Sequence, residues 1–210
     1  ENCTEQEAMK TLQNIYAKEI EKYGKENVVV LLPYRKKGIC SNALNNRLQQ
    51  IANSERSGYR HYCKADDNTL FFMKHDLVMQ LSNRDECANG DVGEVLDVSP
   101  RGVLVNFNDK EVLYSLDDLD QLCLAYAMTV HKSQGSEYKS VIVCMMNCHT
   151  AMLTRNLLYT GITRAKKECT VVYQQKAFTT AVATIAEASR ITMLKEKLRT
   201  CYMQYKAVCG

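Results

Sequence analysis

Proline, glycine and long apolar runs are scarce in this chain of 210 residues. It has 2 Pro and 9 Gly, too few for a collagen-like or low-complexity segment. The longest apolar run, Val28–Leu32, has the length of a buried strand, whereas a membrane-spanning helix needs about 20 apolar residues. Residues 1–5 have neither a basic nor an apolar stretch, so no secretory signal is visible. Because the first residue is Glu rather than Met, we expect a fragment of a longer protein.

Cysteine is frequent, with 10 residues, but its spacing is irregular. The one cluster is Cys144-x3-Cys148-His149, and no second CxxC-type pair completes four zinc ligands. A chain of this length does not need a disulfide framework for stability. The cysteines therefore predict free thiols in a reducing cytoplasm, and no metal site.

Charge is distributed unevenly although the net charge is only +3. Residues 1–65 carry a net charge of +4, residues 66–120 of −9 and residues 121–210 of +8. The two basic segments are therefore expected to belong together, on either side of an acidic insertion. A polyanion would favour the basic part, although a surplus of Lys equally fits a solvated face.

The two basic segments alternate between helical and strand-like patterns. Apolar residues recur at helical spacing over 5–23, with Gly24 at the C-cap position, and Val28–Leu32 has the continuous apolar pattern of a buried parallel strand. Residues 42–52 again predict a helix. Further predicted elements are strands at Leu122–Ala127, Val141–Met145 and Cys169–Tyr173 and helices at Leu153–Thr160 and 177–206. This order is typical of an α/β fold with a parallel sheet.

The acidic middle instead shows short, partly alternating apolar runs separated by turn residues such as Asn89-Gly90. Such a pattern predicts a small all-β module inserted into the α/β domain. The expected strands are Leu70–Phe72, Asp76–Leu81, Val92–Val98, Gly102–Asn106 and Glu111–Ser115.

Two polar segments are too dense in hydroxyl, imidazole, ammonium and amide groups for ordinary loops. The first is TVHKSQG at 129–135, which follows an apolar strand, and the second is YTGITRAK at 159–166, which precedes one. Strand-to-loop transitions are where α/β sheets place ligand-binding groups. Both segments resemble motifs V and VI of superfamily 1 helicases, in the same order and with a similar separation.

Other segments resemble the RecD/TraA branch of these helicases. VLLPYR at 30–35 resembles motif IV, and ALN at 43–45 with LQ at 48–49 resembles the element that follows it. FMKHDLVMQ at 72–80 with NGDVG at 89–93 resembles the SH3-like insertion of that branch, except that His75 replaces its usual Gly and puts a turn conformation in question.

The resemblance implies a RecA-like domain 2A, of the P-loop-NTPase type with a parallel sheet, formed by residues 1–66 plus 121–210. A small SH3-like β-barrel insertion, domain 2B, is expected at 67–120. The sequence contains no GxxxxGK[ST] phosphate loop and no Asp-Glu pair after an apolar strand. In the family those elements, with most contacts to ATP and Mg²⁺, belong to the N-terminal motor domain 1A. We therefore expect the chain alone to be catalytically inactive.

The resemblance also assigns roles to individual residues. Arg164 would be the arginine finger that neutralises charge on the transferred phosphate, and Arg35 a second contact to the γ-phosphate. Nucleotide contacts are further expected at Tyr34, Gln134, Gly135 and Glu137, and contacts to single-stranded DNA at Thr129, His131, Lys132, Ser133 and Asn45. From the residues alone, a helix-end salt bridge is the minor alternative for Arg164, whereas His131 taken by itself favours a buried core position.

The expected function is thus the C-terminal motor half of an ATP-dependent 5′-to-3′ DNA helicase in a bacterial cytoplasm. Its expected partners are single-stranded DNA, its own 1A domain and, as an open question, other recombination or repair subunits, with no membrane contact. The alternatives are a nucleic-acid-binding or protein-docking module without motor activity and a helicase of opposite polarity. A stand-alone helicase, an exodeoxyribonuclease V alpha subunit and a relaxase-linked helicase are not distinguished.

Overall fold

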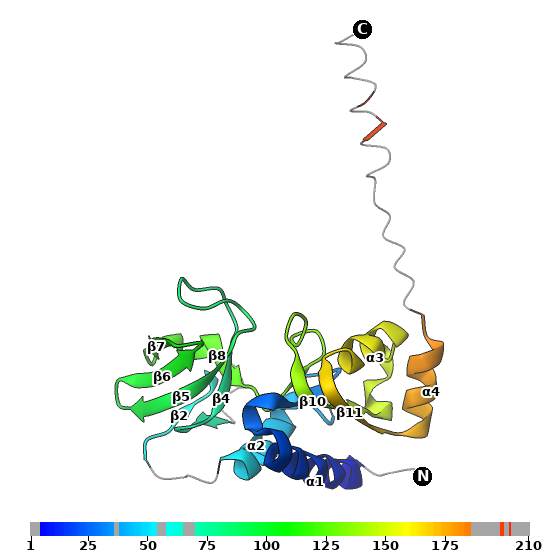
Figure 1. Ribbon diagram of the computed structural model, residues 1–210, viewed down its shortest axis with the longest axis horizontal. Coiled ribbons are helices and arrows are strands. Elements are labelled where there is room, and N and C mark those ends of the chain that lie inside the picture. The colour runs from blue at the N-terminus through cyan, green and yellow to red at the C-terminus, as the bar shows by residue number, and fades with distance from the viewer. Residues whose placement is uncertain are drawn as a thin grey trace.

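A computed structural model describes residues 5–35, 38–53, 58–64, 70–185, 198, 199 and 202. The described strands form a parallel sheet, an antiparallel sheet and a separate two-stranded hairpin of β2 and β3, and helices pack around the parallel sheet (Figure 1). The elements are α1 Glu5–Tyr23, η1 Lys25–Asn27, β1 Val28–Leu32, α2 Ser41–Ala52, β2 His61–Tyr62, β3 Phe71–Phe72, β4 Leu77–Gln80, β5 Val92–Ser99, β6 Gly102–Phe107, β7 Lys110–Tyr114, η3 Asp118–Gln121, β8 Leu122–Leu124, β9 Ala127–Thr129, β10 Tyr138–Met145, η4 Asn147–Met152, α3 Arg155–Ile162, β11 Ala165–Tyr173 and α4 Gln175–Ala183.

The first sheet is parallel and has the strand order β11-β10-β1-β9. All five residues of the inner strand β1 are buried, as its continuous apolar sequence predicts for a strand covered on both faces. Helix α1 packs against β1 and β10, and α3 packs against β10 and β11. The predicted α/β fold with a parallel sheet is confirmed.

The second sheet is antiparallel and has the order β7-β6-β5-β4-β8. It occupies the left side of Figure 1, away from α3 and α4. Its strand β8 extends the sheet to Leu124, beyond the residue at which we expected the insertion to end. The predicted strand Leu122–Ala127 is in fact two strands, because β8 pairs with β4 whereas β9 pairs with β1. An SH3-like topology for this module remains a prediction.

The buried carboxylate of Asp76 joins the two sheets. Its oxygens accept hydrogen bonds from Gln49 Nε2 (2.6 Å) and Asn53 Nδ2 (2.8 Å) of the α2 region. They also accept from the Tyr126 hydroxyl (2.8 Å) and from the Met73 amide (2.7 Å). Burial raises the pKa of Asp76, and these four donors act in the opposite direction. The network therefore fixes α2 relative to β4 and to the segment between β8 and β9.

His75, which replaces a glycine expected from the resemblance, adopts a left-handed conformation with φ 68°. Glycine favours this region because it has no Cβ. The backbone is held by a hydrogen bond from the His75 amide to the Val95 carbonyl (2.8 Å) and by the Lys25 ammonium, which donates to the His75 carbonyl (2.5 Å). The turn is thus retained despite the substitution.

Of the helix predicted over 177–206, the structure assigns α4 at Gln175–Ala183, and most of the later residues lie outside the described part of the chain. Among the described residues, no helix has the length and apolar character required to cross a membrane.

Candidate functional site

Most of the predicted site residues lie at two opposite edges of the parallel sheet, and two of them face a third surface toward α3. Parallel strands share one amino edge and one carboxyl edge. Arg164 lies at the amino edge, because its carbonyl accepts a hydrogen bond from the amide of Tyr138, the first residue of β10 (2.9 Å). Arg35 lies beyond the carboxyl end of β1, next to the end of β9.

At the amino edge, the guanidinium of Arg164 joins the two predicted motifs. Its Nε donates to the Thr160 carbonyl (3.2 Å), and its two terminal nitrogens donate to the Ser136 carbonyl and to the Thr163 hydroxyl (both 3.3 Å). These contacts use three of its five N–H donors. Arg164 is therefore oriented by neutral acceptors, and no carboxylate among the described residues is within ion-pair distance of it.

Glu137 lies in the same loop and forms an ion pair with Lys166 (3.0 Å), in which both side chains are more than half exposed. Exposed pairs of this kind contribute little to stability. The Glu137 carboxylate can therefore give up its contact with Lys166 and bind a hydroxyl group of a ligand at a small cost in free energy.

Gly135 precedes this loop segment and has φ +92°. A Cβ at this position would meet nothing within 4 Å, so the backbone conformation, rather than lack of space, explains the glycine. Gly135 is exposed in this turn, and its contact to a nucleotide stays a prediction.

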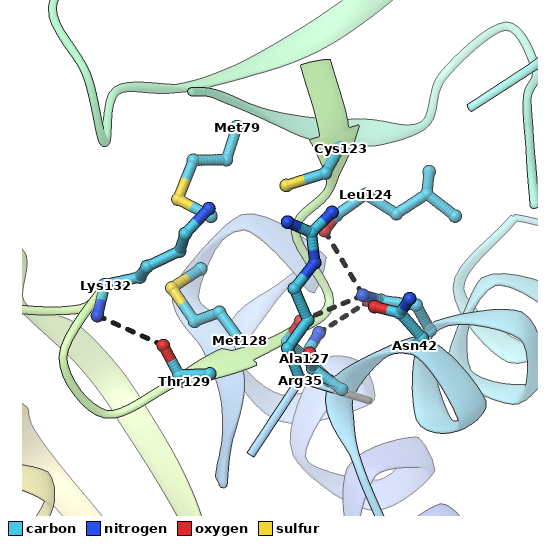
Figure 2. A pocket seen from close by; sticks show the side chains of 11 residues that line it. Arg35, Asn42, Met79, Cys123, Leu124, Ala127, Met128, Thr129 and Lys132 are labelled. Carbon is cyan, nitrogen blue, oxygen red and sulfur yellow. Dashed lines mark hydrogen bonds between the residues drawn. The ribbon is translucent and has the colours of Figure 1, made fainter. Parts of the chain in front are cut away.

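At the carboxyl edge, a narrow crevice lies between α2, β9 and the antiparallel sheet (Figure 2). Arg35 and Lys132 contribute its cations, and Thr129 a hydroxyl group. Figure 2 shows the side chains of Arg35 and Lys132 extending toward the side on which Met79 and Cys123 lie. Two cations beside hydroxyl and amide groups suit a phosphodiester backbone.

Asn45 lines the floor of the crevice and is buried. Its Oδ1 accepts from the Ala127 amide (2.8 Å), and its Nδ2 donates to the carbonyls of Ala127 (2.9 Å) and Leu124 (3.3 Å). Its amide is thus used to hold the start of β9 against α2. The structure gives Asn45 a positioning role rather than the predicted direct contact to DNA.

The structure does not bring Arg35 and Tyr34 together with Arg164. On β10, the strand register places Tyr138 at the level of Arg164 and the position after Val143 at the level of Leu32. The six residue steps between these levels span about 20 Å. Arg35 lines the crevice beside β9 whereas Arg164 bonds to Ser136 at the amino edge, so the two arginines are not neighbours in the structure, and their shared contact to the γ-phosphate stays a prediction.

Tyr34 instead packs against His149, with ring centroids 5.8 Å apart at 64°. The His149 Nδ1 accepts from the Met146 amide (3.1 Å), which leaves Nε2 as the donor to the Ile39 carbonyl (2.7 Å). Burial lowers the pKa of His149. The neutral imidazole of His149 therefore holds the backbone of Ile39 next to η4.

His131 and Gln134 face a third surface, away from the crevice. They line a cavity of about 310 Å³ together with Thr154, Asn156 and Thr160 of the α3 region. The loop 130–137 therefore divides its side chains, with Lys132 at the crevice and His131 and Gln134 toward α3.

Ser133 does not fit its predicted contact to DNA. It is fully buried, and its hydroxyl donates to the Val130 carbonyl (2.8 Å). A serine that bonds back to the main chain three residues earlier stabilises a tight turn. Its role is to shape the loop that carries Lys132.

Sequence reasoning missed Asp76 and Lys166. Asp76 could have been noticed because a lone carboxylate precedes the apolar run Leu77–Met79, where burial is expected. Lys166 gave no such signal, because it lies among other cations and its partner Glu137 is distant in sequence.

Residues 124–172 match the family model of the UvrD-like helicase C-terminal domain. The chain is 35% identical over 174 residues to the ATP-dependent RecD2 DNA helicase of Deinococcus radiodurans, an alignment that covers 82% of this chain and 23% of the relative. It is 38% identical over 111 residues to the RecBCD enzyme subunit RecD of Haemophilus influenzae, covering 52% of this chain and 16% of the relative. The chain thus spans less than a quarter of the length of these curated relatives.

Among solved structures, the fold is similar to that of Bacteroides Pif1 bound to ssDNA, with a TM-score of 0.50, 16% identity and coverage of 86% of this chain and 46% of that one. A second structure, of Pif1 helicases at forked dsDNA, gives a TM-score of 0.51 at 13% identity, covering 92% of this chain and 48% of the other. At these identities the likeness concerns the fold, and it agrees with a RecA-like helicase domain.

Proposed function

We propose that this chain, which carries a UvrD-like helicase C-terminal domain and is related to the RecD-type helicases of superfamily 1, is the C-terminal motor half of an ATP-dependent 5′-to-3′ DNA helicase. Its nucleotide-loading half, domain 1A, would belong to the same longer protein. The chain alone would hydrolyse ATP negligibly, because its sequence has no phosphate loop.

One observation carries this proposal. The eight-residue loop 130–137 connects the carboxyl end of β9, beside Lys132, to the amino end of β10, where Ser136 accepts from Arg164. A single short loop thus has one end at a cationic crevice and the other at an anchored arginine. In this proposal a shift of the loop at one edge would be transmitted to the other, and strand binding would thereby be coupled to nucleotide hydrolysis.

On the nucleotide side, ATP with Mg²⁺ would supply the phosphoryl group that is transferred to water. Arg164 would neutralise charge that develops on that group when domain 1A closes against the amino edge. Its orientation by uncharged acceptors supports this role, because the positive charge is not cancelled in advance. The accessible backbone of Gly135 and the carboxylate of Glu137 would contact the same nucleotide, and Gln134 would sense it from the adjoining cavity.

On the strand side, Arg35, Lys132 and Thr129 would hold the phosphates of single-stranded DNA, with Asn45 and Ser133 shaping the crevice behind them. His131 would contact the strand where the loop turns toward α3. This proposal assigns Arg35 to the DNA, whereas the resemblance implies a contact to the nucleotide. Further recombination or repair subunits are possible partners of the longer protein, as the RecBCD relative illustrates.

Strand separation by the longer protein tests the proposal. We expect ATP-dependent unwinding of a duplex with a 5′ single-stranded tail, and none with a 3′ tail. Efficient unwinding from the 3′ tail would contradict the polarity. Binding of single strands without ATP hydrolysis would instead favour a nucleic-acid-binding module without motor activity.

A further inference from the structure

A second surface with the chemistry of a nucleic-acid site lies outside the crevice, on the hairpin of β2 and β3. Tyr59 and Tyr62 are 61% and 59% exposed. The Tyr62 and Phe71 rings meet edge to face with centroids 5.8 Å apart, and the Arg60 guanidinium carbon lies 5.5 Å from the Phe71 centroid. Exposed aromatic rings combined with arginine form the stacking surfaces on which unpaired bases bind.

The hairpin is held firmly in this orientation. The Gln49 side chain of α2 donates to the Phe71 carbonyl (2.8 Å), and His61 Nε2 lies 2.7 Å from the Ser99 carbonyl at the end of β5. In the β2–β3 pair, His61 lies opposite the buried Phe72 and Tyr62 lies opposite Phe71. Alternation along the strands therefore directs Tyr62 and Phe71 to the outer face.

A row of amide side chains on α2 leads from the crevice toward this hairpin. Asn42, Asn46 and Gln50 are spaced four residues apart on α2 and so form a line along one side of the helix. Asn42 lines both the crevice and a shallow groove of about 580 Å³, which also contains Asn46, Gln50 and Leu70. Leu70 directly precedes β3. The line covers about 12 Å from Asn42 to Gln50.

The charges along this route repel a polyanion less than the rest of the antiparallel sheet does. Helix α2 contains Arg47 and no Asp or Glu, and residues 58–72 balance Arg60 and Lys64 against Asp66 and Asp67. Residues 73–120, in contrast, carry 4 Lys/Arg and 11 Asp/Glu, a net charge of −7. A phosphodiester chain is therefore repelled by most of the antiparallel sheet but not by α2 or this hairpin.

We propose that single-stranded DNA leaving the Arg35–Lys132 crevice continues along the amide line of α2 and stacks its bases on Tyr62 and Tyr59. This inference rests on the proposed function, since it extends the strand-binding site of the same domain. The amides of α2 would bond to phosphates or base edges, and the hairpin would add sequence-independent stacking.

Binding of oligothymidylates of two lengths to the full chain tests this extension. Lengths of about 4 and about 16 nucleotides correspond to the range that one small binding module covers. The double variant Tyr59→Ala/Tyr62→Ala should bind the long oligonucleotide roughly tenfold more weakly and the short one as the wild type does. Tyr62→Phe should retain the affinity, because its ring remains. Leu113→Ala, which shortens an exposed apolar side chain of β7, is the matched control and should change nothing.

Unchanged affinity of the double variant for the long oligonucleotide, with an unchanged melting temperature, would overturn the extension and leave the hairpin as a protein-docking surface. Equal weakening for both lengths would also overturn it, because the hairpin would then be the primary site. Lys132→Ala separates this outcome from failure of the proposed function. It should weaken both lengths, and if it weakens neither, the crevice itself is not a strand-binding site.

Discussion

The two edges of the parallel sheet differ in how they hold an arginine. At the amino edge, Arg164 is oriented by two carbonyls and a hydroxyl group, beside an exposed and easily exchanged Glu137–Lys166 pair. At the carboxyl edge, Arg35 shares a narrow crevice with Lys132, and the buried amide of Asn45 lines it and holds β9 against α2. The amino edge thus presents one oriented guanidinium, and the carboxyl edge presents two neighbouring cations. One oriented charge suits stabilisation of a transition state, and neighbouring cations suit retention of a polyanion.

The largest effect is expected from removal of the Arg164 guanidinium. Arg164→Ala in the longer protein should lower strand-stimulated ATP turnover about 10³-fold, the effect of losing an arginine finger. Strand affinity should be retained, because the crevice lies at the other edge. Arg155→Ala is the matched control: Arg155 is the first residue of α3, the helix that ends shortly before Arg164, and its Nε donates to the Val182 carbonyl (3.0 Å). A control as inactive as Arg164→Ala would show that damage to α3, rather than loss of one charge, is responsible.

The carboxyl edge can be loosened selectively through Asp76. Asp76→Ala removes a buried carboxylate that accepts from four groups and should lower the free energy of unfolding by about 3 kcal/mol, since its donors are left unsatisfied. Urea unfolding measures this loss, with the exposed Asp97→Ala as control. Strand affinity should fall in the folded variant. A loss no larger than that of Asp97→Ala would show that the network does not fix α2.

Neutralising Lys132 sharpens the assignment of the crevice. Lys132→Ala should weaken binding of single strands roughly fivefold and reduce the slope of log affinity against log salt by about 0.7, the contribution of one phosphate contact. Fluorescence anisotropy at several salt concentrations measures both. A weaker affinity with an unchanged slope would mean that Lys132 acts through packing and not through a phosphate.

The smallest expected effect concerns the imidazole that secures the segment after Arg35. Because burial lowers the pKa of His149 in the folded chain, the unfolded chain binds its proton first as the pH falls. The stabilisation is therefore complete above the usual histidine pKa of about 6.5 and decreases as the pH falls from there through the folded-state value. Unfolding of the wild type and of His149→Gln between neutral and mildly acidic pH measures it. The variant should lose this component of the pH dependence, whereas His131→Gln, at an exposed position, should keep it.

Much of the fold was predictable from local pattern. The strand Val28–Leu32 has its predicted bounds because a continuous run of three Val and two Leu is typical of a strand buried on both faces. The stretch 122–127 was misread as one strand because all its residues are apolar and buried in either sheet. The change of partner strand occurs at Ala125 and Tyr126: the Ala125 amide donates to the Leu77 carbonyl, and the Tyr126 carbonyl accepts from the Val30 amide. The apolar pattern of the sequence gives no sign of this change.

The chemistry of the site was predictable by residue type but not by location. Motif resemblance selected Arg164, Arg35 and Lys132 and assigned Arg35 to the nucleotide, whereas the structure places Arg35 in one crevice with Lys132, and this proximity was not visible in the sequence. Ser133 was selected for its hydroxyl group, which the structure shows bonded to the main chain. Side-chain direction within a turn depends on backbone angles that the sequence alone leaves open.

The central claim is that the two arginines serve different ligands, and one titration tests it. ATP turnover of the longer protein is measured against the concentration of single-stranded DNA for Arg35→Ala and Arg164→Ala. We expect Arg35→Ala to raise the half-saturating DNA concentration and to preserve the turnover at saturation. We expect Arg164→Ala to abolish turnover at every DNA concentration. A collapse of the saturating turnover in Arg35→Ala equal to that in Arg164→Ala would place both arginines on the nucleotide and contradict the separation.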